Sequence, residues 1–87
     1  MNNVAKDFLN VKKGDIVYAY DECSREGDVH KVKVNSIENN KENACEDNPD
    51  GKTLYVTDLD CLDEDGKYDT DEYIGVVTLN NFCGLNN

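Results

Sequence analysis

A stretch of fifteen residues, from Asp58 to Glu72, sets the strongest limit on how this chain can fold. It contains eight carboxylates against a single base, Lys67. Because like charges at this density repel one another, the stretch has to face water, hold a cation or meet a basic partner. The eight carboxylates belong to Asp58, Asp60, Asp63, Glu64, Asp65, Asp69, Asp71 and Glu72.

The negative charge is concentrated in the second half of the chain. Residues 1–40 hold seven acids and six bases, whereas residues 41–87 hold twelve acids and three bases, a net charge of −9. This sign is wrong for contacts with nucleic acid phosphates or with an anionic membrane surface, which attract Lys and Arg. It suits a basic groove on another protein, or solubility alone. We therefore predict that the eight carboxylates are the partner-binding residues.

The length of the chain predicts one small domain, residues 1–87, with a core of about two dozen apolar side chains. Burial alone stabilises such a domain only marginally, so a metal, a disulfide or a partner would help it. The first ten residues contain no apolar run long enough for export or for crossing a membrane. We expect a cytoplasmic protein whose thiols stay reduced.

Several short segments carry the residue pattern of β-strands. β-branched and aromatic residues predict strands over residues 16–20, 29–37, 53–57 and 73–79. The pattern is clearest in the second, where His30, Val32 and Val34 share one face. Val4, Phe8 and Val11 have the spacing of a short N-terminal helix. The sequence therefore predicts a mainly β fold, a small antiparallel barrel or curled sheet with a short N-terminal helix.

The segments between the expected strands carry turn and loop chemistry. Residues 38–52 predict a long polar loop that ends in the turn Asn48-Pro49-Asp50-Gly51. Gly75 indicates a bulge or bend in the last strand, and Phe82 and Leu85 are expected to dock the C-terminal tail. The run V-K-K-G-D-I-V-Y-A-Y, residues 11–20, resembles the first strand of small SH3-like barrels, where a Gly-Asp turn precedes an apolar strand. This resemblance concerns the fold and implies no activity.

Groups suited to catalysis are scarce. The chain has one histidine, no Ser or Cys in a nucleophile-elbow context and no glycine-rich phosphate loop. His30 lies on the apolar face of its expected strand, which favours a core or edge histidine with a hydrogen bond over a metal ligand or a base. The carboxylates lie in a hydrated run where their pKa values would not be tuned for proton transfer. We predict that the protein is not an enzyme.

Part of the acidic stretch resembles the calcium loop of an EF-hand. When Gly66 is aligned with the turn glycine, Asp63, Asp65, Asp69 and Glu72 occupy the third, fifth, ninth and twelfth positions. The first position is Cys61 instead of Asp, and the flanking segments have the pattern of strands instead of helices. These departures favour a solvated loop over a calcium site.

The four cysteines could supply the ligands of a structural zinc ion. Each lies in a polar, turn-like context outside the middle of any expected strand, and a tetrahedral zinc site in a small domain needs four such ligands. No C-x-x-C pair is present, so unpaired or buried thiols are an equal alternative, and the reduced compartment disfavours disulfides. His30 is the reserve ligand. The predicted set is Cys23, Cys45, Cys61 and Cys83.

In size, acidity and lack of catalytic groups, the chain resembles the small phage-encoded anti-CRISPR proteins. This resemblance is compositional, and it implies a protein-binding inhibitor that blocks an RNA-guided nuclease in the host cytoplasm. The physical expectation is that an acidic surface occupies the basic nucleic-acid-binding groove of a larger protein, with no direct contact to nucleic acid or membrane. The alternative is a non-enzymatic accessory or adaptor domain, stabilised by zinc or less readily by calcium, whose acidity only serves solubility.

Overall fold

The computed structural model describes residues 3–22 and 25–86, which form one helix, one 3₁₀ turn and five strands. The molecule is elongated, measuring 39 × 23 × 22 Å. In chain order the elements are α1 (Asn3–Asn10), β1 (Ile16–Tyr20), β2 (Val29–Asn39), η1 (Lys41–Asn43), β3 (Lys52–Asp58), β4 (Val76–Val77) and β5 (Phe82–Gly84).

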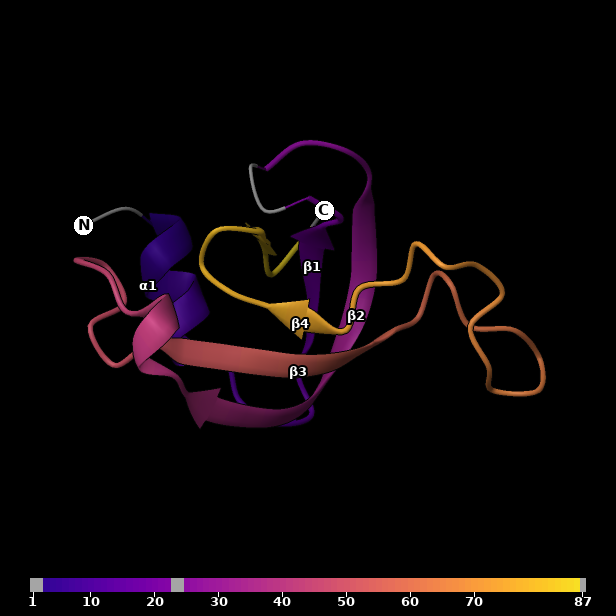
Figure 1. Ribbon diagram of the computed structural model, residues 1–87, viewed down its shortest axis with the longest axis horizontal. Helices are drawn as coiled ribbons and strands as arrows, with labels where there is room; N and C mark the ends of the chain where they lie inside the picture. The colour runs from indigo at the N-terminus through magenta and orange to yellow at the C-terminus, as the bar shows by residue number, and fades with distance from the viewer. Residues whose placement is uncertain (1–2, 23–24, 87) are drawn as a thin grey trace.

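The five strands form a single antiparallel sheet in the order β4-β3-β2-β1-β5. The long strand β2 pairs with β1 over its first residues and with β3 from Val32 to its end at Asn39. A register shift between Val34 and Ser36 bends β2, because a bulge increases the local twist of a strand. The sheet therefore curls into a half-barrel (Figure 1), which confirms the predicted mainly β, curled antiparallel fold with a short N-terminal helix.

The core fills the concave side of the curled sheet. Val32 and Val34 are buried while Lys31, Lys33 and Asn35 are exposed, as the alternation in β2 predicts. The core cluster consists of Phe8, Val11, Val17, Ala19, Val32, Val34, Leu54, Val56, Ile74, Val77 and Phe82.

Helix α1 closes one side of this core. Phe8 packs edge-on against Phe82 of β5, with 5.3 Å between the ring centroids. The amine of Lys52 donates hydrogen bonds to the carbonyls of Leu9 (2.8 Å) and Val11 (2.7 Å), where the helix leaves carbonyl groups without intrahelical partners. Burial of this amine lowers the pKa of Lys52. The predicted helix is thus confirmed, and β3 supplies its C-terminal cap.

The segment 38–52 has more order than a plain loop. Strand β2 continues to Asn39, and the fully buried Asn48 then organises the turn. The Asn48 side chain accepts a hydrogen bond from the Lys52 amide (3.0 Å) and donates to the Lys52 carbonyl (3.1 Å). Gly51 has a φ of 68°, and a Cβ there would meet the carbonyl of Asn40, so the turn requires glycine.

Two expectations for the C-terminal part were wrong. The expected strand 73–79 is reduced to β4, Val76–Val77, because the amide of Ile74 donates to the Asp58 side chain (2.9 Å) instead of a strand partner. Leu85 does not dock, since it is 43% exposed. Phe82 is completely buried, as expected, and lies in a further strand, β5, that the sequence pattern did not indicate.

The contrast between Phe82 and Leu85 gives a direct test of the core. Replacing Phe82 with Ala should lower the free energy of unfolding by about 3–5 kcal/mol, the usual cost of removing a buried aromatic ring. Leu85→Ala should change it by less than about 0.5 kcal/mol, because its side chain is largely in water. Urea unfolding measures both, and Phe82→Leu provides a milder variant if Phe82→Ala is unfolded. Equal effects at the two positions would contradict this packing.

Candidate functional site

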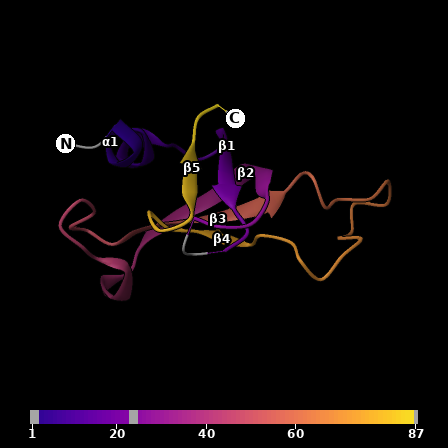
Figure 2. The same cartoon turned by 90° about the horizontal axis from the view of Figure 1, so that it is seen from above.

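The acidic loop, defined here as residues 59–75, joins β3 to β4 and projects from one end of the long axis (Figure 1). The segment around η1 projects from the opposite end, and Figure 2 shows the same arrangement from above. Seven of the eight predicted partner-binding carboxylates are exposed on this loop: Asp60, Asp63, Glu64, Asp65, Asp69, Asp71 and Glu72.

Local hydrogen bonds and one aromatic pair give the acidic loop a defined shape. The Asp63 carboxylate accepts hydrogen bonds from the amides of Asp65 (2.9 Å) and Lys67 (2.8 Å), which closes the turn at the tip. Tyr68 and Tyr73 stack with their ring centroids 3.9 Å apart. The carboxylates are therefore carried on an ordered loop, which lowers the entropy lost when they contact another molecule.

The eighth carboxylate, Asp58, is not part of this surface. Its side chain is completely buried at the end of β3, so its predicted role in partner binding is wrong. One oxygen, Oδ2, accepts hydrogen bonds from His30 Nδ1 (2.6 Å) and the Ile74 amide (2.9 Å), and the other, Oδ1, accepts one from the Asp60 amide (3.0 Å). Because these donors come from β2 and from both ends of the acidic loop, Asp58 fastens the base of the loop to the sheet.

The inward position of Asp58 has a sequence signal that the charge pattern obscured. In β3, Leu54, Val56 and Asp58 follow one another at intervals of two residues, and all three are buried on the same face. Asp58 is aligned with Val32 of β2, two residues after His30. The alternation of a strand thus continues one step into the acidic stretch and turns its first carboxylate inward.

His30 is the histidine with a hydrogen bond that its strand position predicts. Its side chain is 12% exposed, and its second ring nitrogen, Nε2, lies 3.9 Å from the carboxylate of Asp21. Two acidic side chains from different segments, Asp21 and Asp58, therefore flank opposite nitrogens of one imidazole ring. This arrangement fixes the orientation of the ring.

Cys61 completes a buried group beside His30. The thiol sulfur lies 3.7 Å from His30 Nδ1, and the residue is only 5% exposed. Burial, followed by the negative charge of Asp58, raises the pKa of the Cys61 thiol to about 11. The thiol is thus protonated at neutral pH.

This geometry does not activate a cysteine nucleophile. In a nucleophile–His–Asp triad the nucleophile and the carboxylate contact different ring nitrogens, so that one proton can move through the imidazole. Here Cys61 and Asp58 both approach Nδ1, while Nε2 faces Asp21. A raised thiol pKa also opposes nucleophilic attack, which requires the thiolate.

The group formed by His30, Asp58 and Cys61 could instead hold a metal ion. One ligand atom from each residue lies within 4.8 Å of the others, and within residues 3–22 and 25–86 no other group of three or more His, Cys, Asp or Glu side chains meets this spacing. The calcium-loop carboxylates Asp63, Asp65, Asp69 and Glu72 are accordingly not gathered around one point.

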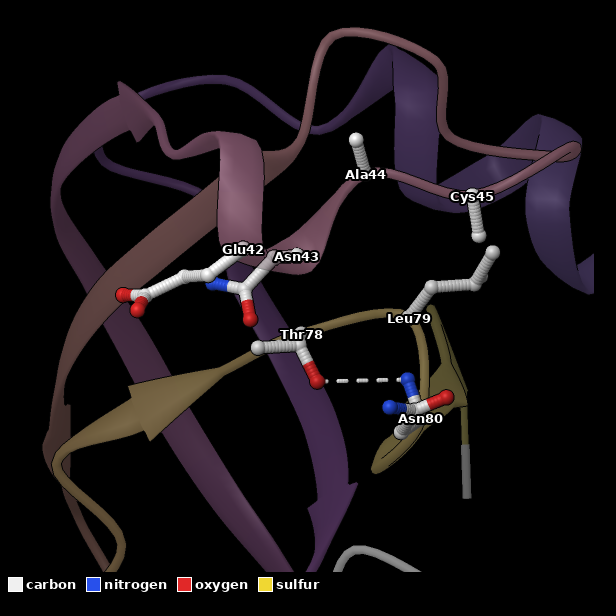
Figure 3. A pocket seen from close by; sticks show the side chains of 7 residues that line it. All are labelled: Glu42, Asn43, Ala44, Cys45, Thr78, Leu79 and Asn80. Atoms are coloured by element: carbon white, nitrogen blue, oxygen red, sulfur yellow. Dashed lines mark hydrogen bonds between the residues drawn. The ribbon is translucent and has the colours of Figure 1, made fainter.

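The predicted four-cysteine zinc set is dispersed where the structure describes it. Cys61 lies in the buried group with His30, the predicted reserve ligand. Cys45 is exposed, and it lines a pocket of about 100 Å³ beside Leu79 at the η1 end of the molecule (Figure 3). Cys83 is half-buried in β5, and Cys23 lies outside the described residues. The ligand that sequence reasoning missed is Asp58.

Comparison with known proteins gives no relative from which to transfer a function. No family model, no curated protein and no solved structure matches the chain. In the part of the chain that the structure describes, no helix is long and apolar enough to cross a membrane.

The different settings of Cys45 and Cys61 predict different thiol reactivity. In metal-free protein at pH 8, a water-soluble disulfide reagent should modify the exposed Cys45 faster than Cys61, and it should modify Cys61 at least about a hundredfold more slowly than in unfolded protein. A pKa raised from 9.0 to about 11 leaves about a hundredfold less thiolate, and burial slows access further. Peptide mass spectrometry distinguishes the two sites, and urea-unfolded protein is the control in which the rates should converge. Equal rates in the folded protein would contradict the burial of Cys61.

Proposed function

We propose that this protein is a binding inhibitor that inserts its acidic loop into a basic groove of a larger nucleic-acid-binding protein. The observation that carries this proposal is the concentration of seven exposed carboxylates on one ordered, projecting loop. Such a loop attracts a cationic groove over several ångströms and competes there with nucleic acid phosphates. A chain with a net charge of −10 has the wrong sign to bind nucleic acid itself.

An RNA-guided nuclease is the partner that the resemblance to anti-CRISPR proteins suggests. Such a nuclease holds its guide–target duplex in a positively charged channel, which an acidic loop could occupy. The fastening of the loop by Asp58 and the internal stacking of Tyr68 on Tyr73 support this proposal, because both reduce the ordering cost of docking.

Charge reversal at the loop tests the proposal. Glu64, Asp65 and Glu72 are exposed and can be changed to Lys together, whereas Asp63 is kept because its side chain closes the turn. The triple variant should associate with a basic partner at least about tenfold more slowly at low salt, since steering changes on-rates by roughly 10- to 1,000-fold. Raising the ionic strength should also lower the association rate of the wild-type protein, because salt screens the attraction between the charges.

The matched control reverses three exposed acids at the opposite end of the molecule, Glu42, Glu46 and Asp47. It changes the net charge by the same amount, so it separates a local contact from the overall charge. The partner is first captured from a bacterial lysate with and without nuclease treatment, and rates are then measured by surface plasmon resonance. If both triple variants bind like wild type, the acidic loop is a solubilising surface and the proposal fails.

The buried group favours a second candidate, an accessory domain stabilised by a metal ion, in which the acidity serves solubility. Zinc is the metal that suits a nitrogen, an oxygen and a sulfur donor together, whereas calcium prefers oxygen ligands alone. Elemental analysis of protein purified without added metal tests this candidate. About one zinc per chain, together with a melting temperature that falls on chelation, would support it, and metal-free protein of unchanged stability would argue against it.

A further inference from the structure

The buried group at the base of the acidic loop carries an inference of its own. We propose that His30 Nδ1, Asp58 Oδ2 and Cys61 Sγ bind one Zn²⁺ ion, which fixes the acidic loop to the sheet. This proposal rests on the second candidate function, the zinc-stabilised domain, and is independent of docking to a basic partner.

The ligand atoms could surround a small tetrahedral ion after a small movement of one of them. Around zinc, neighbouring nitrogen, oxygen and sulfur ligands lie about 3.3–3.6 Å apart, given zinc–ligand distances of about 2.0–2.3 Å. The Cys61 sulfur is 3.7 Å from His30 Nδ1, which already fits. Asp58 Oδ2 lies 2.6 Å from the same nitrogen, a hydrogen-bond length, so the ion takes the place of the ring proton and separates these two atoms by about 0.7 Å.

The charges of the group balance with a divalent cation. Asp58 supplies one negative charge and Cys61, once deprotonated by the metal, supplies a second, while the His30 ring is neutral. Zn²⁺ therefore gives a buried centre with no net charge, although Asp58 is completely inaccessible to water. A cation bound at this point would offset the cost of keeping a carboxylate out of water.

The groups around the three ligands have the arrangement found around zinc centres. A histidine that binds metal through one ring nitrogen usually donates its other N–H to a carboxylate. The Asp21 carboxylate faces His30 Nε2 at 3.9 Å, and this distance must shorten to about 3 Å for a hydrogen bond to form. Asp58 is held by the amides of Asp60 and Ile74, and the carbonyl of Cys61 accepts a hydrogen bond from the Asp69 amide (2.8 Å). Asp58 and Cys61 are thus oriented by contacts that metal binding leaves in place.

The three ligands also come from parts of the chain that only the folded protein brings together. His30 lies in β2, Asp58 ends β3, and Cys61 belongs to the acidic loop. An ion bound to all three stabilises the folded state against the unfolded one, because the unfolded chain does not hold these ligands at this spacing. The group supplies three protein ligands instead of the four expected of a structural zinc site, so the fourth tetrahedral position is left to water or to an external ligand.

The test is a titration of the chelator-treated, full-length protein with Co²⁺ and Zn²⁺, with Ca²⁺ as the comparison cation. We expect one Co²⁺ per chain, visible bands of a tetrahedral complex and a near-ultraviolet sulfur-to-cobalt band, all displaced by Zn²⁺. Cys61→Ser should abolish the sulfur band, and His30→Gln should weaken zinc binding at least about 100-fold. Asp21→Asn should weaken it by about tenfold, the usual effect of losing a partner of a ligating histidine. Ca²⁺ should bind no more tightly than about 1 mM.

Cys45→Ser is the matched control, because it removes an exposed thiol that lines a different part of the surface and is not a member of the group, and it should leave the titration unchanged. The wild-type cobalt spectrum and the exposed Asp21→Asn variant keep the test decisive if Cys61→Ser does not fold. This ligand set would be overturned if wild type showed no sulfur-to-cobalt band and if both His30→Gln and Asp21→Asn bound one zinc ion per chain with unchanged affinity. The proposal of a zinc-stabilised domain would survive that result. No zinc binding by wild type would overturn both.

Discussion

The buried Asp58 carboxylate is the interaction on which the rest of this structure depends. It joins β2 to the end of β3, through His30, and it receives the amides at both ends of the acidic loop, Asp60 and Ile74. Leaving a buried hydrogen-bonding group without its partner typically costs about 1–3 kcal/mol, a large part of the stability of a domain of this size. The exposed carboxylates of the acidic loop are thus carried on a loop whose two ends are held by the buried Asp58.

This arrangement explains which parts of the structure the sequence reveals. The strand faces of β2 and the helix face of α1 follow from the spacing of neighbouring side chains, so Val32, Val34 and Phe8 could be assigned to the core from the sequence. His30 contacts Asp58 and Cys61, which lie 28 and 31 positions further along the chain. No local sequence pattern shows that residues so far apart in the chain come into contact. The position of His30 in its strand therefore predicted a hydrogen bond, but it did not predict which residue would be the partner.

The shortening of the expected strand 73–79 at its start has a physical origin. The segment after the acidic stretch, Tyr73 to Leu79, is rich in the β-branched and aromatic residue types of a strand, and residue types were the only guide. In the folded protein a side chain takes the hydrogen bond that a neighbouring strand would otherwise make with Ile74, so the ladder stops there. Asp58 was misassigned for a related reason, since its charge outweighed the alternation that places it beside Leu54 and Val56. When a side chain takes the place of a backbone hydrogen-bond partner, the contact depends on the tertiary structure, which the pattern of a single sequence does not show.

The stacked pair of Tyr68 and Tyr73 also makes the acidic loop optically distinct from the rest of the protein. The chain has five tyrosines and no tryptophan, so nothing masks the tyrosine absorption and emission. Two rings held nearly parallel, with an interplanar angle of 7°, interact electronically and contribute a dichroic signal that isolated tyrosines lack. A change in the near-ultraviolet spectrum on replacing Tyr68 or Tyr73 would therefore isolate the contribution of this loop from that of the three strand tyrosines, without a dye.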